Sequence, residues 1–139
     1  MLNRFNTVSI LDTIEMIEKY RLDIRTVTMG MSLLGCTRPT MEATAEAVYD
    51  RVTTRASQLV EVCEGIEAEL GIPIVNKRIS ITPVSLIVAG VDGNPVDVAR
   101  ALDRAATETG VDFVGGYSAL VEKGATTAEK ALILSLIHI

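Results

Sequence analysis

The chain has 139 residues, of which 48% are hydrophobic, so it is about one domain in size and can bury a sizeable core. Its 13 basic residues are outnumbered by 18 acidic ones and are scattered, which argues against a nucleic-acid partner. The longest apolar run, 131–139, is too short to cross a membrane, and the first residues lack the apolar stretch of a secretory signal. We therefore expect a cytoplasmic protein with no membrane partner, in which Cys36 and Cys63 are free thiols.

The first third of the chain predicts a helix, a strand and a loop. Apolar residues three and four positions apart follow Ser9, a good N-cap, and predict a helix that ends near Tyr20. Residues 24–31 are rich in β-branched side chains and predict a strand. Residues 32–39 contain glycine and proline without periodicity, so we expect a loop at the carboxyl end of that strand.

A long helix is predicted over 41–70. Thr40 can cap it, an apolar stripe continues along it, and the Gly71 that follows is a typical stop signal. A straight helix of this length would measure about 45 Å, whereas a compact chain of this size is roughly 35–40 Å across. The helix would therefore overhang its own domain unless it breaks near Gly65.

The second half of the chain alternates strands and helices again. We expect a strand over 74–81, a short buried helix over 84–90 for which a strand is the alternative, and a helix that begins after Asn94 and ends at Gly110. A third strand over 111–117 and a last helix from about Thr127 follow. This order implies an α/β fold with parallel strands and crossover helices.

The predicted fold is incomplete. Three parallel strands leave two bare edges, and parallel sheets normally have more strands and helices on both faces. The last helix also ends in an apolar segment without a stop signal. We therefore expect an N-terminal fragment of a larger α/β protein. A small complete domain whose apolar tail docks on itself or on a twin subunit is the alternative.

Cys36 is the candidate for reactive chemistry. It follows the first predicted strand, and ligands of parallel α/β proteins bind outside the carboxyl ends of strands. A nucleophilic cysteine needs a base or a positive charge to support its thiolate. Arg38 is close in sequence, but no histidine can be assigned as a partner. The alternative is a small buried hydrophobic residue.

Four polar residues of the first two strands are candidate ligand contacts: Arg25, Asn76, Lys77 and Arg78. Strand alternation places Lys77 on one face and Asn76 and Arg78 on the other. In a barrel one of these faces points inward, where a buried cation needs an anionic ligand or a carboxylate partner. These residues could therefore hold a carboxylate or a phosphate. Structural ion pairs are the alternative.

Gly115 and Gly116 close the third predicted strand and allow another group to approach the backbone closely. We include both among the candidate ligand contacts, with a tight packing turn as the alternative. They do not form a dinucleotide-binding or phosphate-loop motif, so the cofactor is unknown. His138 is isolated and the two cysteines are 27 positions apart, so no metal site is predicted.

Three segments, 23–36, 69–83 and 110–124, resemble the amino-terminal part of a bacterial and archaeal family of uncharacterised proteins, domain of unknown function 711 (uncharacterised protein family 0210). The resemblance covers the chain to about Ile133 and implies a partial, three-stranded piece of a ten-stranded pyruvate formate-lyase-like α/β barrel. It departs at Gly35, where an acidic residue is expected, and over 134–139. The sequence therefore predicts one barrel portion over 1–133 and a non-family tail over 134–139, which looks like translated read-through.

The resemblance implies no activity, and it does not place the radical cysteine or the radical glycine of glycyl radical enzymes on this chain. We interpret the sequence as part of an uncharacterised protein that binds a small anionic molecule and leave open whether it is an enzyme. A non-enzymatic regulatory or assembly module is the alternative. The full-length parent is expected to be a homodimer.

Overall fold

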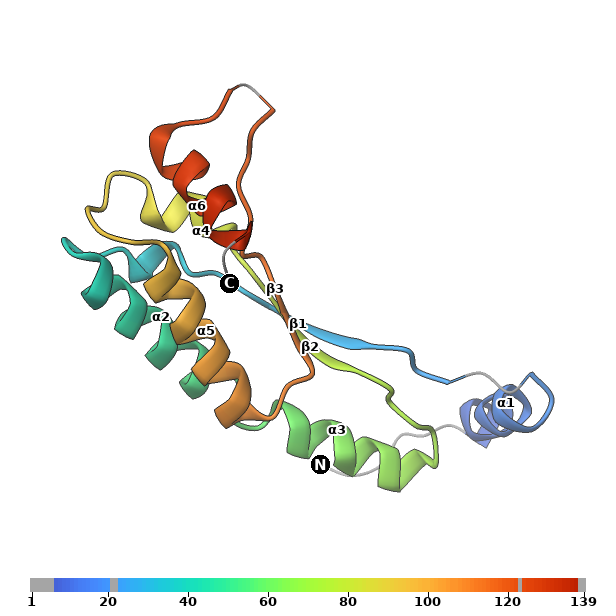
Figure 1. Cartoon of the computed structure of the whole chain (residues 1–139). Coiled ribbons are helices and arrows are strands. Elements are labelled where there is room, and N and C mark those ends of the chain that lie inside the picture. Colours follow the sequence, from blue (N-terminus) through green and yellow to red (C-terminus); the bar gives the residue numbers. More distant parts are fainter. Residues whose placement is uncertain (1–6, 21–22, 123, 138–139) are drawn as a thin grey trace.

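A computed structural model describes residues 7–20, 23–122 and 124–137 (Figure 1). Its sheet has three parallel strands in the order β1-β2-β3, formed by Val27–Met31, Lys77–Ile81 and Phe113–Gly115. The predicted α/β class and parallel strand direction are therefore confirmed for the described part of the chain. Each strand is shorter than its sequence pattern predicts.

The described residues also form six α-helices and one 3-10 helix. The helices α2 and α5 lie side by side along one face, and α4 and α6 lie together at the carboxyl ends of the strands (Figure 1). Their bounds are α1 Thr7–Glu18, η1 Leu34–Cys36, α2 Met41–Ala56, α3 Leu59–Leu70, α4 Val84–Val88, α5 Val96–Thr109 and α6 Thr127–Ile137. The short-helix prediction after Thr82 is confirmed, and the strand alternative there is not.

The core lies between the sheet and the α2–α5 pair. Ile79 of the central strand pairs with Met29 on one side and Val114 on the other, so these three side chains share a face. All three belong to or pack against one apolar cluster with Val48 of α2 and Leu102 of α5. Covering this face with two helices buries Ile79 completely.

The opposite face of the sheet carries no large aliphatic side chain. By the same alternation it presents six residues, which we call the open face: Thr28, Gly30, Arg78, Ser80, Phe113 and Gly115. Arg78 and Gly115 are half-buried and the other four are exposed. The sheet is thus apolar toward α2 and α5 and mainly small and polar on its other side.

The prediction of one helix over 41–70 is wrong, because the chain breaks between α2 and α3. The break lies at Ser57 and Gln58, not at Gly65. Gln58 leaves the helical region with φ −107° and ψ 0°, and Ser57 Oγ donates to the carbonyl of Thr54 at 3.2 Å. A serine hydroxyl that competes for the backbone in this way favours a helix end. The break redirects α3 toward the start of β2 (Figure 1).

Two predicted helix ends are confirmed, whereas the predicted cap Ser9 lies inside α1, which begins at Thr7. Thr40 Oγ1 accepts from the amide of Ala43 at 3.3 Å, and Gly71 ends α3 in the left-handed region with φ 67°. Thr82, in contrast, does not cap α4, because its hydroxyl accepts instead from the amide of Leu33 at 3.1 Å. That bond joins the two loops that follow β1 and β2.

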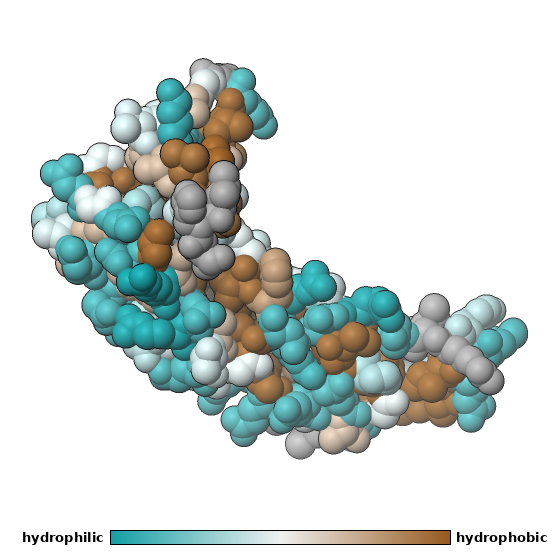
Figure 2. Space-filling view, in the orientation of Figure 1, coloured by the Kyte–Doolittle hydropathy of each residue, from teal (hydrophilic) through white to brown (hydrophobic). Residues whose placement is uncertain are grey.

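Apolar side chains remain exposed on several elements. The helix α1 buries none of its described residues, and its Leu11 is 60% exposed. Phe113 of the edge strand β3 and Leu134 of α6 are 57% and 56% exposed. Figure 2 shows apolar surface in the hollow between the α6 end and the α3 end of the molecule. Within the described residues, no helix is both long and apolar enough to span a membrane.

Candidate functional site

The structure distributes the predicted site residues along the sheet and does not gather them in one place. Arg25 and Asn76 precede β1 and β2, at the amino end of the sheet. Cys36 and Gly116 follow β1 and β3, at the carboxyl end. Arg78 lies between these ends, on the open face. The candidate contacts therefore separate into groups with different surroundings.

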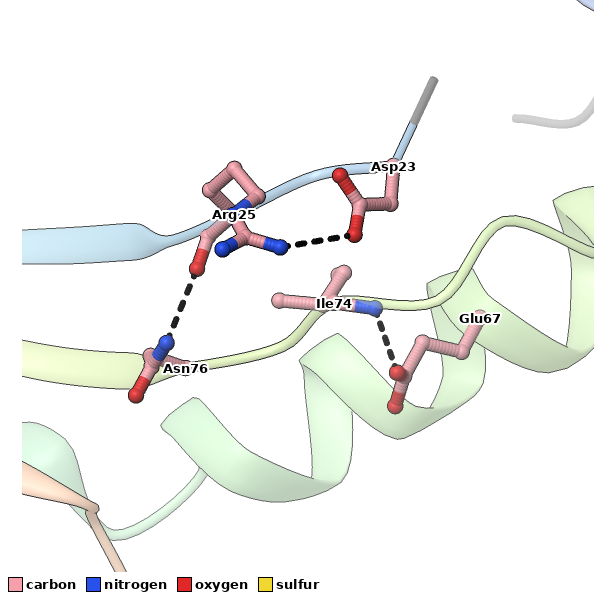
Figure 3. A network of polar contacts seen from close by, with 5 residues as sticks. All are labelled: Asp23, Arg25, Glu67, Ile74 and Asn76. Carbon is pink, nitrogen blue, oxygen red and sulfur yellow. Dashed lines mark hydrogen bonds and ion pairs between the residues drawn. The ribbon is translucent and has the colours of Figure 1, made fainter. Parts of the chain in front are cut away.

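At the amino end of the sheet, polar side chains connect the segments that lead into β1 and β2 (Figure 3). Arg25 Nη1 lies 3.3 Å from Asp23 Oδ2, and Asn76 Nδ2 donates to the carbonyl of Arg25 at 3.1 Å. The Arg25 side chain is 78% exposed. Arg25 has a carboxylate partner and an exposed side chain, so a structural ion pair explains its position without a bound ligand.

Lys77 also has a carboxylate partner. It lies on the helix-covered face, where its Nζ is 3.3 Å from Oε2 of Glu67 on α3. The other carboxylate oxygen, Oε1, accepts from the amide of Ile74 at 2.5 Å (Figure 3). The Ile74 amide, together with the Lys77 ammonium, lowers the pKa of Glu67 against the opposing effect of burial. Glu67 therefore connects α3 to the start of β2.

We expect the stability of the chain to depend on pH through Glu67. A carboxyl whose pKa is lower in the folded state stabilises the fold above its ordinary value of 4.5, and this contribution is lost as the pH falls below 4.5. The Glu67→Gln variant should therefore be less stable than the parent at pH 7 and lose less stability between pH 5 and pH 3. Urea unfolding at a series of pH values measures both effects.

The matched control is Glu64→Gln on the exposed side of the same helix. We expect its unfolding midpoints to follow those of the parent chain across the same pH range. If Glu67→Gln also follows the parent at every pH, Glu67 does not hold α3 to β2.

Arg78 differs from the other two cations. Its guanidinium carbon lies 5.7 Å from the centre of the Phe113 ring, as in a cation–π contact. Its Nε is buried and has no hydrogen-bond partner in the described part of the chain. No carboxylate among the described residues forms a salt bridge with it. The open face therefore contains a half-buried guanidinium without an acidic partner.

The two candidate glycines have a packing role of their own. Gly116 has φ +123°, and a Cβ there would lie 2.6 Å from the carbonyl oxygen of Ile81. Its own carbonyl accepts from the amide of Val84 at 2.9 Å, which connects the end of β3 to the start of α4. The space at Gly115 is less restricted than at Gly116, because an added Cβ would lie 3.4 Å from the Phe113 ring.

Cys36 lies at the floor of a pocket of about 620 Å³ at the carboxyl end of β1. Its side chain is 1% exposed, and burial raises the pKa of the thiol, although Arg51 and Arg38 act in the opposite direction. The thiol is therefore protonated at neutral pH and is not an activated nucleophile in this state. None of the residues predicted as anion contacts lines this pocket.

Sequence reasoning missed two residues of the Cys36 pocket, Arg51 and Arg55. Both are on α2, and four positions separate them, so helical periodicity places them on one face. That spacing was a readable signal. The sequence alone does not show that α2 packs beside η1, the turn that carries Cys36.

No group of three or more potential metal ligands occurs among the described residues.

The fold and the site define an α/β protein with a parallel sheet, helices against one sheet face and a polar pocket at the carboxyl end of β1. The chain belongs to the family described as Uncharacterised ACR (DUF711), whose model matches residues 15–139. This confirms the resemblance found in the three sequence segments. The match includes residues 134–139, whose assignment to a non-family tail stays a prediction.

Three relatives, each named UPF0210 protein, illustrate the similarity. One from Corynebacterium glutamicum is 74% identical over 127 residues, which cover 91% of this chain and 27% of the relative. One from Streptococcus uberis is 55% identical over 126 residues, covering 90% and 28%. One from Clostridium beijerinckii is 53% identical over 132 residues, covering 94% and 29%. The chain thus spans less than a third of the length of these relatives.

Proposed function

We propose that the chain forms part of a pyruvate formate-lyase-like α/β barrel and that its open face binds a small anionic molecule through Arg78. The parallel strands and the placement of α2 and α5 on one face support a barrel portion with helices outside. In such a barrel the open face points inward. A cytoplasmic location and a homodimeric longer parent stay predictions.

The unpaired state of Arg78 carries the proposal. Arg25 and Lys77 each have a carboxylate partner, whereas Arg78 has none among the described residues. A half-buried guanidinium loses hydration, and an oxyanion that accepts from two of its N–H groups compensates for that loss. Carboxylate and phosphate groups match the planar donor geometry of arginine. Arg78 is therefore the best-placed anion contact of the residues that the sequence identified.

The neighbours of Arg78 on the open face are mainly small residues. Gly115 lacks a side chain, and Ser80 and Thr28 present short hydroxyl side chains on the same face. Hydroxyl groups donate hydrogen bonds to anionic oxygens. Phe113 flanks the guanidinium and limits its orientations. The ligand is thus expected to be small, with its charged group at Arg78.

A titration of the chain with anions tests this proposal. We expect the guanidinium NMR signals of Arg78 to shift and saturate with sodium succinate or sodium phosphate at constant ionic strength. Arg78→Gln should weaken the apparent affinity, read in parent and variant from the backbone signals of Ser80, by at least about tenfold, since a hydrogen bond to a charged group contributes about 1.5–3 kcal/mol. The fitted dissociation constants measure this loss.

Arg100→Gln is the charge-matched control, because Arg100 is an exposed arginine on α5 outside the open face. This variant should bind like the parent. Equal losses in both variants, or Arg78 signals that change no more in succinate than in sodium chloride, would contradict an anion site on the open face.

A further inference from the structure

A second group of arginines lies away from the open face. Arg38, Arg51 and Arg55 line the pocket of about 620 Å³ whose floor contains Cys36. The pocket lies between the loop after η1 and one side of α2. None of the three was among the predicted anion contacts.

The loop and the helix hold two of these guanidinium groups close together. Arg38 Nη1 donates to the carbonyls of Gly35 and Thr37 at 3.0 and 2.9 Å, which fixes the side chain against its own loop. Arg51 Nη2 lies beside the same residue, at an ordinary van der Waals distance of 3.6 Å from the place that a Cβ of Gly35 would occupy. Both arginines therefore lie next to Gly35, on one side of the pocket. Arg55 follows one helical turn after Arg51.

The charges of the pocket do not cancel. Two acidic residues, Glu46 and Asp50, also line it. Glu46 is already paired outside this group, since its Oε1 lies 2.6 Å from Arg104 Nη2. In the described part of the chain, neither Arg51 nor Arg55 forms a salt bridge. Three guanidinium groups therefore face one remaining carboxylate, although the whole chain has a formal charge of −5.

We propose that this pocket binds a phosphate dianion, either free phosphate or the phosphate group of a small monoester. Three guanidinium charges and the Asp50 carboxylate leave an excess of two positive charges, which matches the nearly two negative charges of a phosphate group at neutral pH. Arginine forks provide paired donors for its oxygens. The Cys36 thiol is neutral and adds no repulsion to the floor of the pocket.

The site is independent of the proposed function, because Arg78 belongs to a different face. It also lies at the carboxyl end of β1, which is the end of a parallel sheet where ligands bind. The phosphate ligand and the open-face ligand therefore have separate contacts, and separate variants distinguish them.

Titration with inorganic phosphate and with glycerol 2-phosphate tests the proposal and separates the two sources. At constant ionic strength, we expect the backbone signals of Gly35 and the guanidinium signals of Arg51 to shift saturably. Similar affinities for both probes indicate recognition of the phosphate group alone, and tighter binding of the ester indicates a monoester ligand. Shifts that do not saturate, or that sodium chloride reproduces, would overturn the proposal.

Arg55→Gln and Arg51→Gln identify the site. Each should weaken phosphate binding by about tenfold, and exposed Arg55 can be replaced with little risk to folding. Arg78→Gln and Arg100→Gln should leave the shifts at Gly35 unchanged. Loss of these shifts in Arg78→Gln but not in Arg55→Gln would overturn this site and leave the open-face proposal intact.

Cysteine protection provides a second readout. Cys36 and Cys63 are both buried, so N-ethylmaleimide reaches each thiol only when the fold opens locally. Phosphate should hold the pocket closed and slow the reaction of Cys36 several-fold, and it should leave Cys63 on α3 unaffected. Arg55→Gln should remove this protection. Equal protection of both thiols would show general stabilisation of the fold and contradict a ligand above Cys36.

Discussion

Replacing Gly116 with alanine is expected to cost about 4 kcal/mol of unfolding free energy, which is a large part of the stability of a small domain. The φ of +123° belongs to a region that residues with a side chain rarely adopt. The added methyl would also lie 2.5 Å from Ile81 Cγ1 and 2.6 Å from the Ile81 carbonyl oxygen. Backbone strain and overlap therefore add, and neither neighbour can move without disturbing β2.

Urea unfolding measures the loss, with Gly90→Ala as the control. Gly90 also has a positive φ, +75°, but an added Cβ there meets nothing within 4 Å. Gly90→Ala should lower the free energy of unfolding by only about 1–2 kcal/mol, which is the cost of placing alanine in the left-handed region. If the two variants are equally stable, the contact between Gly116 and Ile81 does not constrain the end of β3.

The second large effect is expected for Ile79→Ala, which should lower the free energy of unfolding by about 3 kcal/mol. Ile79 is the middle residue of the central strand, is fully buried and packs in the cluster between the sheet and the helices. Removing three carbons leaves a cavity, because strands on both sides prevent the neighbouring side chains from closing over it.

The same change at an exposed isoleucine is the control. Ile10 on α1 is 47% exposed, and Ile10→Ala should change the unfolding free energy by less than about 0.5 kcal/mol. Thermal or urea unfolding of both variants gives the comparison. A small loss for Ile79→Ala would mean that α2 and α5 do not pack tightly on the sheet.

The local pattern was sufficient to predict most elements of the fold. A stop glycine such as Gly71, a cap such as Thr40 and β-branched runs act within a few residues, so they are readable without tertiary contacts. The strand ends were less predictable. At the first residue of β2, the Lys77 amide donates to Asp112 Oδ2 at 2.7 Å instead of to another strand, and no periodicity reveals such a bond.

The candidate site was predictable only in part. Cys36 and Arg78 were chosen as candidates from their strand positions, but the pattern could not show which cations have acidic partners. Glu67, ten positions before Lys77, reaches it because α3 packs beside the start of β2. Arg51 was overlooked because its proximity to Gly35 depends on how η1 and α2 pack.

Residue types and their periodicity thus define the α/β class, helix ends such as Thr40 and Gly71, and the apolar face of each strand, because these depend mainly on neighbours along the chain. Packing settles the break at Ser57 and Gln58, the pairing of Lys77 with Glu67, and the convergence of Arg38, Arg51 and Arg55 over Cys36. These features join residues from different elements, whose separation in space follows from how the helices cover the sheet.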